Sequence, residues 1–248
     1  MRPLDGMTAL VTGASRGIGA AAAIKLAEAG ARVVVHYHAA RDKAEATARE
    51  CERLGAGTLV LQADLGSPDG PDRLKRALDE AGLEPDILVN NAGVSRYGLF
   101  TDVTERDWDE VVGVNLRGVF RLTQLIVPAM VRRRYGRIIN VSSVWGIAGA
   151  SCEVLYSLTK GGVNAFTKAL AKELAPSGVT VNAVAPGVVE TDMMRGFREE
   201  ELAALKEDIP AGRLATSEEI ASLIRYLALP EAGYITGQII SPNGGWIT

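Results

Sequence analysis

The sequence predicts an α/β fold in which helices cover both faces of a parallel sheet. Short, β-rich apolar runs alternate with longer helical patterns along the whole of the 248 residues. Several runs are apolar at consecutive positions, which is typical of strands that are buried on both faces. No Pro- or Ser-rich linker, internal repeat or low-complexity tract interrupts the alternation. We therefore expect residues 1–248 to form a single domain.

The strands follow one another at regular intervals. They are expected at MTALVT (7–12), ARVVVHY (31–37), TLVLQ (58–62), DILVN (86–90), RIINVS (137–142), VTVNAV (179–184) and GQIIS (237–241). The first helix is predicted at 17–30, with Gly30 as its C-terminal cap. Thr104 and Asp107 form an N-capping pair that opens a helix to about Met130. Ser217, followed by two glutamates, opens a late helix in the same way.

The longest interruption of this alternation is the segment 187–213. Inserted segments of this kind often form lids over substrate sites, so we predict a substrate lid at about 187–213. A pair of surface helices is the alternative.

Composition excludes several classes of function. The net charge is −3, which provides no overall attraction to nucleic acid or to an anionic membrane. No apolar run approaches the ~20 residues that span a bilayer, and the N-terminus lacks a signal peptide's apolar core. The two cysteines lie far apart, which fits a reduced cytosol, so a cytoplasmic location is expected. A metal site is not expected, and two histidines in one short strand make a histidine nucleophile relay hard to build.

A glycine-rich turn, TGASRGIG (12–19), lies between the first strand and the first helix. Backbone N–H groups at such a helix N-terminus converge on a pyrophosphate. Gly13 permits the tight turn, Gly17 lets the backbone approach phosphate, and Gly19 lets the helix pack on the strand. The motif therefore predicts dinucleotide binding, although a purely structural turn is the alternative.

The end of the second strand indicates which dinucleotide is bound. An acidic residue there accepts hydrogen bonds from a ribose 2′-hydroxyl, but this strand ends at His38, with Arg41 close behind. Arg16, in the glycine turn, can reach the same ribose, and guanidinium groups suit a 2′-phosphate. We therefore predict NADP(H). The alternative is that both arginines are only solvated.

Tyr156 and Lys160 are spaced i, i+4, so they lie one turn apart on one face of a helix. A free tyrosine titrates near ~10. A nearby ammonium is expected to lower that pKa, which would make the phenol suitable for acid–base catalysis.

Taken together, these motifs resemble the classical short-chain dehydrogenase/reductase family. TGASRGIG resembles its cofactor turn and NNAG (90–93) its adenosine-side motif. Asn115, Ser143, Tyr156 and Lys160 match its catalytic tetrad in order and spacing. APG (185–187) and Thr191 match its nicotinamide segment. The residues that this resemblance assigns to the cofactor are Gly13, Ser15, Arg16, Gly17, Ile18, Gly19, His38, Arg41, Asp64, Leu65, Asn91, Ala92, Gly93, Tyr156, Lys160, Pro186, Gly187, Val189 and Thr191.

The resemblance implies a Rossmann fold and reversible hydride transfer between a nicotinamide and a carbonyl or alcohol. Tyr156 is expected to donate the proton, Ser143 to orient the carbonyl oxygen, and Lys160 also to hold the nicotinamide ribose. Asn115 is expected to anchor a water relay. Ser142 is the alternative to Ser143 and would end the strand. The family commonly forms homotetramers, and the helices at 105–131 and 153–175 can pack against copies of themselves or simply cover the sheet.

Within the family, the segment 161–187 and the ending NGGW resemble 3-oxoacyl-[acyl-carrier-protein] reductases. An acyl-carrier protein is acidic, so cations are expected near the pocket mouth, with Arg132, Arg133, Arg134 and Lys172 as candidates. The alternative is that the arginine run is a solvated helix end.

One segment departs from that branch. GIAGASCEVLY (146–156) replaces its usual Gly/Asn/Gln-rich loop and resembles reductases of the 5-aminopentanone modification on elongation factor P. Ser143, Cys152, Glu153 and Tyr156 are the expected substrate contacts. Glu153 favours a cationic substrate group, although a role at a helix N-terminus is its alternative, and Cys152 is interpreted as packing. A non-enzymatic regulator that binds the dinucleotide is the remaining alternative for the whole chain.

Overall fold

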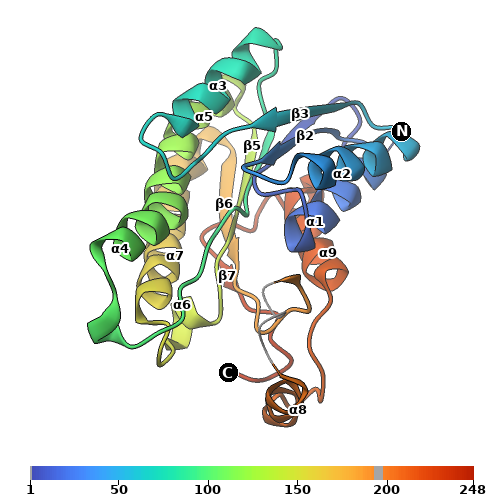
Figure 1. Cartoon of the computed structure of the whole chain (residues 1–248). Helices are drawn as coiled ribbons and strands as arrows, with labels where there is room; N and C mark the ends of the chain where they lie inside the picture. Colours follow the sequence, from blue (N-terminus) through green and yellow to red (C-terminus); the bar gives the residue numbers. More distant parts are fainter. Residues whose placement is uncertain (1, 193–197) are drawn as a thin grey trace.

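The computed structural model describes residues 2–192 and 198–248. These residues form one seven-stranded sheet with the order β3-β2-β1-β4-β5-β6-β7 (Figure 1). The strands are β1 (Thr8–Val11), β2 (Arg32–Tyr37), β3 (Thr58–Gln62), β4 (Ile87–Asn90), β5 (Gly136–Val141), β6 (Val179–Val184) and β7 (Ile239–Ile240). Every neighbouring pair is parallel. The predicted fold class and all seven predicted strands are confirmed.

Helices cover both faces of this sheet (Figure 1). In the described residues the α-helices are α1 (Gly17–Glu28), α2 (Arg41–Arg53), α3 (Gly70–Glu80), α4 (Glu105–Val112), α5 (Val119–Arg133), α6 (Trp145–Ala148), α7 (Val154–Leu174), α8 (Glu199–Asp208) and α9 (Ser217–Ala228). Of these, α8 lies away from the sheet (Figure 1). Residues of α1, α2 and α9 pack in one hydrophobic cluster, and residues of α3, α5 and α7 in a second. Along β2, Val33 and Val35 join the first cluster and Val34 joins the second. Both faces of β2 are therefore buried, which explains its consecutive apolar residues.

The helix ends follow the predicted capping residues closely. The Asp107 N–H donates to Thr104 Oγ1 at 3.1 Å, and the Thr104 N–H donates to Asp107 Oδ2 at 3.1 Å. Gly30 follows the last residues of α1 with φ +107°, a conformation that favours glycine. The late helix is capped by Thr216, not by Ser217, because the Thr216 hydroxyl accepts from the Glu219 N–H.

The long helix predicted from Thr104 is not regular throughout. A π-helical segment, Gly113–Gly118, joins α4 to α5. Asn115 lies within this segment. Single π-helical turns inside α-helices are often found at functional sites because they redirect side chains.

The carboxyl-terminal edge of the sheet brings the predicted motifs together. The strand order reverses between β1 and β4, since the chain runs outward from β1 to β3 and then returns to β4. A parallel sheet binds ligands in the crevice at such a reversal. The glycine turn and NNAG motif lie on either side of this point.

The segment 187–213 leaves the same edge of the sheet. Its first residues are held by the backbone just before α9, because Val189 pairs with Ala215 and the Glu190 N–H donates to Ala215 O at 2.9 Å. Part of the predicted lid, residues 193–197, lies outside the described residues, so the lid stays a prediction. Among the helices of the described ranges, none is long and apolar enough to cross a membrane.

Candidate active site

The glycine turn requires glycine at two positions because other backbone lies close to it. A Cβ on Gly13 would lie 2.9 Å from the Ala92 Cα, and Gly13 has φ +63°. A Cβ on Gly19 would lie 2.3 Å from Gly13 O. Among the described residues, no side chain caps the first turn of α1 and none in that turn is acidic. Its N–H groups are therefore available to an anion, which fits a dinucleotide pyrophosphate.

The NNAG motif holds this turn from the side of β4. Asn91 Nδ2 donates to Thr12 O at 2.9 Å and to Gly13 O at 3.1 Å. In return, Thr12 Oγ1 accepts from the N–H groups of Asn91 and Ala92 at 2.9 and 3.0 Å. The turn is therefore preorganised by hydrogen bonds to β4.

His36 also hydrogen-bonds the glycine turn, a role that the sequence did not predict. The Gly13 N–H donates to His36 Nδ1 at 3.1 Å, so Nδ1 carries no proton. His36 Nε2 therefore carries the proton and donates it to Ala63 O, at 3.1 Å. Burial lowers the pKa of His36 to about 4, which keeps the ring neutral at physiological pH. A histidine inside an otherwise apolar buried strand was the signal in the sequence.

The four predicted catalytic residues meet at the carboxyl edge of the sheet. Asn115, Ser143 and Lys160 are all buried, and Lys160 is 4% exposed. Lys160 Nζ donates to Val141 O at 2.8 Å and lies 5.5 Å from the centre of the Tyr156 ring. A Cβ on Gly93 would lie 3.4 Å from both Lys160 Nζ and Asn115 Oδ1. The NNAG motif therefore adjoins the tetrad as well as the glycine turn.

Asn115 is held by the chain on both sides. Its Oδ1 accepts from the Val94 N–H at 2.9 Å, and its Nδ2 donates to Val94 O at 2.8 Å and to Thr159 Oγ1 at 3.1 Å. These bonds join the π-helical segment to the loop after β4 and to α7. The side chain thus positions α7, which carries Tyr156 and Lys160.

The two adjacent serines have different roles. Ser142 Oγ donates to Lys160 O at 3.2 Å and is buried against α7. Ser143 Oγ accepts from the Trp145 N–H at 3.2 Å and lies near enough to the Tyr156 phenol to lower the phenol pKa. Ser143, and not Ser142, therefore lies where it can contact the same carbonyl oxygen as Tyr156.

Burial shifts the pKa of Tyr156 in the direction opposite to the one predicted. Burial raises the pKa of Tyr156 to about 12, the Ser143 hydroxyl opposes this shift, and the Glu153 carboxylate adds to it. Burial also lowers the pKa of Lys160 to about 8. The prediction that Lys160 lowers the phenol pKa is wrong for this structure, because burial favours the uncharged form of both groups. At neutral pH the phenol is therefore protonated and can act as a donor.

Glu153 lies next to the phenol and has a partner that the sequence did not reveal. Ser95 Oγ donates to Glu153 Oε1 at 2.7 Å. Glu153 is the N-cap residue of α7, but its side chain makes no capping hydrogen bond. Cys152 adopts φ +62°, and its carbonyl accepts from the Gly98 N–H at 2.8 Å. The loop 95–98 is therefore tied to the predicted substrate contacts.

The predicted cofactor residues lie along one edge of the sheet. They follow β1 (Gly13, Ser15, Arg16, Gly17, Ile18, Gly19), β2 (His38, Arg41), β3 (Asp64, Leu65), β4 (Asn91, Ala92, Gly93) and β6 (Pro186, Gly187, Val189, Thr191). Pro186 O accepts from the Val144 N–H at 2.8 Å, which ties this last group to the loop that carries Ser143.

Arg41 has a nearby partner on its own helix. Its guanidinium Nε pairs with Glu45 Oε1 at 2.8 Å. Arg16 and Lys43 instead lie within 3.5 and 3.1 Å of one carboxylate oxygen of Asp192. Lys43 is thus a cation near the cofactor turn that the sequence reasoning missed.

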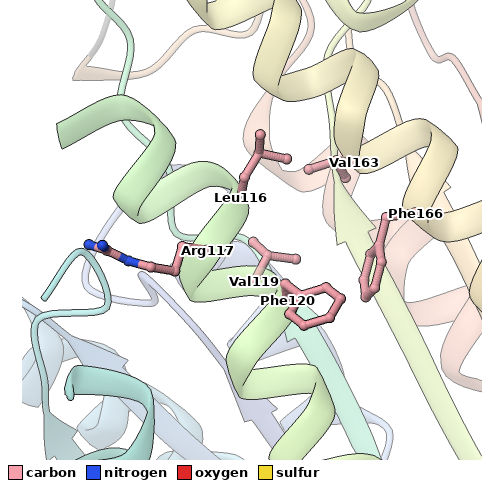
Figure 2. A pocket seen from close by; sticks show the side chains of 6 residues that line it. All are labelled: Leu116, Arg117, Val119, Phe120, Val163 and Phe166. Carbon is pink, nitrogen blue, oxygen red and sulfur yellow. The ribbon is translucent and has the colours of Figure 1, made fainter. Parts of the chain in front are cut away.

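An apolar hollow lies away from this edge, on the outer surface of α5 and α7 (Figure 2). Its volume is about 290 Å³, and its lining is Leu116, Arg117, Val119, Phe120, Val163 and Phe166. The Phe120 and Phe166 rings lie 5.7 Å apart, and Phe120 is 55% exposed. Exposed apolar faces of this kind often mark protein interfaces. The predicted homotetramer stays a prediction.

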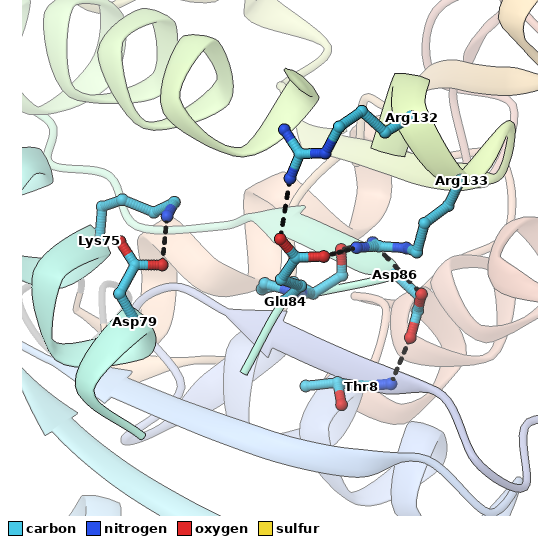
Figure 3. A network of polar contacts seen from close by, with 8 residues as sticks. Thr8, Lys75, Asp79, Glu84, Asp86, Arg132 and Arg133 are labelled. Atoms are coloured by element: carbon cyan, nitrogen blue, oxygen red, sulfur yellow. Dashed lines mark hydrogen bonds and ion pairs between the residues drawn. The ribbon is translucent and has the colours of Figure 1, made fainter. Parts of the chain in front are cut away.

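The arginine run lies at the opposite edge of the sheet (Figure 3). Arg132 pairs with Glu84 at 2.9 Å, and Arg133 pairs with Glu84 at 2.5 Å and with Asp86 at 3.3 Å. Asp86 Oδ2 in turn accepts from the Thr8 N–H at 2.9 Å. Glu84 and Asp86 precede β4, Arg132 and Arg133 precede β5, and Thr8 is the first residue of β1, whereas the tetrad lies beyond the other ends of the strands. Within one chain, the arginines therefore lie at the opposite edge of the sheet from the tetrad, and their contact with a carrier protein stays a prediction.

Comparison with known proteins agrees with this geometry. A family model described as enoyl-(acyl carrier protein) reductase matches residues 13–247. The chain is 45% identical to the uncharacterized oxidoreductase YmfI of Bacillus subtilis, over 96% of this chain and 98% of that protein. It is 43% identical to the 3-oxoacyl-[acyl-carrier-protein] reductase FabG of Vibrio cholerae, over 98% of each chain.

The chain belongs to the short-chain dehydrogenase/reductase family. A solved structure of a putative gluconate dehydrogenase from Agrobacterium tumefaciens has the same fold, with a TM-score of 0.93 and 33% identity. That similarity covers 98% of this chain and 96% of the other. The chain is accordingly an oxidoreductase, and the family uses nicotinamide cofactors.

Proposed function

We propose that this short-chain dehydrogenase/reductase is an NADPH-dependent carbonyl reductase that acts on 3-oxoacyl groups carried by an acyl-carrier protein. The observation that carries the reaction class is the buried Tyr156 phenol, with Ser143 near enough to lower its pKa and Lys160 Nζ 5.5 Å from the centre of its ring. The similarity to 3-oxoacyl-[acyl-carrier-protein] reductases supports the substrate class. A cytoplasmic location, a homotetramer and contact of Arg132, Arg133, Arg134 or Lys172 with an acidic carrier belong to the same proposal.

The side chains divide the chemistry between them. When bound, the reduced dinucleotide supplies a hydride to the carbonyl carbon. Tyr156 donates the proton to the carbonyl oxygen, and its raised pKa keeps that proton available at neutral pH. Ser143 hydrogen-bonds the same oxygen and stabilises its developing negative charge. Lys160 keeps N–H donors beyond the bond to Val141 O, and these suit a ribose hydroxyl.

The preference for NADPH rests on cations and on the lack of a carboxylate at the end of β2. Arg16 and Lys43 supply positive charge beside the glycine turn. Charge-assisted hydrogen bonds to a 2′-phosphate are strong enough to favour NADPH by about tenfold or more. We therefore expect kcat/KM for a 3-oxoacyl thioester to be higher with NADPH than with NADH. Equal or better use of NADH would contradict the assignment, and no oxidation of NADPH across 3-oxoacyl thioesters and small ketones would contradict the proposed reaction.

Glu153 favours a second substrate class, ketones that also carry an amine, such as the 5-aminopentanone group on elongation factor P. Its carboxylate is close enough to Tyr156 to raise the phenol pKa, and Ser95 orients it. An ammonium on the substrate can pair with a carboxylate held in this way.

Replacing Glu153 with Gln tests this second class. We expect Glu153→Gln to raise KM for an amine-bearing ketone by about three- to tenfold, because an ion pair is lost while the side-chain shape is kept. KM for a neutral ketone of the same length should change little. Glu105→Gln, which removes an exposed carboxylate from α4, is the matched control. An equal change in KM for both ketones would show that Glu153 does not pair with an amine on the substrate.

A further inference from the structure

Asp192 lies between two cations at the side of the cleft where the adenosine ribose is expected. Its Oδ2 atom is 3.5 Å from Arg16 Nη1 and 3.1 Å from Lys43 Nζ. Arg16 is the N-cap residue of α1, and Lys43 is in the first turn of α2. Asp192 follows β6. Three separate parts of the chain thus bring two positive groups and one negative group together.

Backbone hydrogen bonds of the preceding residues, 188–190, fix the position of Asp192 beside these two cations. The Glu190 N–H donates to Ala215 O at 2.9 Å, and the Ala215 N–H donates to Val188 O at 3.0 Å. Thr191, which follows Glu190, packs against the glycine turn, since its Cγ2 would lie 3.4 Å from a Cβ on Gly17. Asp192 therefore lies next to the glycine turn that is expected to hold the pyrophosphate.

The Asp192 carboxylate lies between the two cations, where an anionic ligand would also bind. The Asp192 side chain is 28% exposed, whereas Lys43 and Arg16 are 47% and 60% exposed. Arg41, the other cation predicted here, pairs with Glu45. Arg16 and Lys43 are therefore the pair of cations on which a 2′-phosphate can be bound, and Asp192 now neutralises part of their charge. A phosphate monoester carries about two negative charges and competes well for this pair.

We propose that Asp192 is a specificity-determining residue that competes with the cofactor's 2′-phosphate for Arg16 and Lys43. The inference rests on the proposed use of NADPH. A dinucleotide with a 2′-phosphate must displace the carboxylate, whereas NADH does not need these cations. Asp192 therefore lowers the affinity for NADPH. The difference between the affinities for NADPH and NADH becomes smaller as a result.

The test is the affinity of Asp192→Asn for ligands with and without a 2′-phosphate. Dissociation constants are measured by calorimetry for NADPH, NADH, adenosine 2′-monophosphate and adenosine 5′-monophosphate. We expect Asp192→Asn to bind the two 2′-phosphate ligands about three- to tenfold more tightly, as two partly exposed ion pairs allow. The affinity for NADH and for the 5′-monophosphate should stay within about twofold. High salt should shrink the gain, because exposed charges are screened.

Two further variants separate competition from a general effect of charge or structure. Glu190→Gln removes an exposed carboxylate two residues earlier and should not change the preference. In a Lys43→Met background, the gain from Asp192→Asn should be smaller, because one of the contested cations is absent. An equal change for NADPH and NADH, or weaker NADPH binding by Asp192→Asn, would overturn the inference.

The outcome distinguishes this inference from the proposed function. If the wild-type protein prefers NADPH and Asp192→Asn leaves that preference unchanged, only the role of Asp192 is wrong. If the wild-type protein binds both dinucleotides equally but Asp192→Asn gains affinity for NADPH and adenosine 2′-monophosphate and not for NADH, the proposed preference fails and the competition stands.

Discussion

Replacing Tyr156 with Phe is expected to lower kcat for carbonyl reduction by about 10²- to 10⁴-fold, the usual contribution of a positioned proton donor. The aromatic ring and its packing remain, but the transferable proton is lost. Because the phenol pKa is about 12, wild-type Tyr156 holds its proton across neutral and mildly alkaline pH. Single-turnover reduction with saturating dinucleotide measures the loss directly. Dinucleotide affinity, measured separately, should stay within about twofold.

Tyr135→Phe provides the matched control for this variant. Tyr135 precedes β5 at the opposite edge of the sheet, and its hydroxyl contacts Met7 Sδ at 3.4 Å. The control removes the same atom from a half-buried tyrosine and should keep wild-type turnover. Wild-type turnover by Tyr156→Phe would show that another group supplies the proton.

Acid should destabilise the fold through His36, by up to about 3 kcal/mol. The folded-state pKa of His36 is about 4, below its ordinary value of 6.5, because burial disfavours the charged ring. Between these two values the unfolded chain binds a proton that the folded chain does not. The free energy of unfolding therefore falls as pH decreases from about 6.5 to about 4, and at pH 5 the loss from this one group is about 2 kcal/mol.

Urea unfolding of wild type and of His36→Asn at pH 7 and pH 5 isolates this contribution. The Asn side chain can accept the hydrogen bond from the Gly13 N–H but does not titrate. We expect wild type to lose about 2 kcal/mol more than His36→Asn over this range. His38→Asn replaces an exposed histidine two residues later and should behave as wild type does. Parallel losses in wild type and His36→Asn would contradict the assignment.

Most of the fold could be predicted from local patterns in the sequence. The central strands were predictable because they bury both faces and are therefore apolar at consecutive positions. The Thr104–Asp107 capping box was predictable for a similar reason, since both partners lie within one helical turn. The spacing of Tyr156 and Lys160 places them on one helix face whatever packs around that helix.

What the sequence did not reveal depends on neighbours that are distant along the chain. The direction of the Tyr156 pKa shift depends on burial, and burial is a property of the assembled layers. Arg132 and Arg133 resembled a free cationic surface until the fold placed Glu84 and Asp86 beside them.

By itself, the sequence determined the alternation of strands and helices, the glycine turn and the order of the catalytic residues, because each of these is encoded by residues close together in the chain. Only the tertiary structure decided that Ser143 and not Ser142 meets the phenol, that His36 supports the cofactor turn, and that Asp192 faces Arg16 and Lys43. Each of these depends on hydrogen bonds or charges between elements that meet only when the sheet is assembled. Local periodicity carries no information on such pairings.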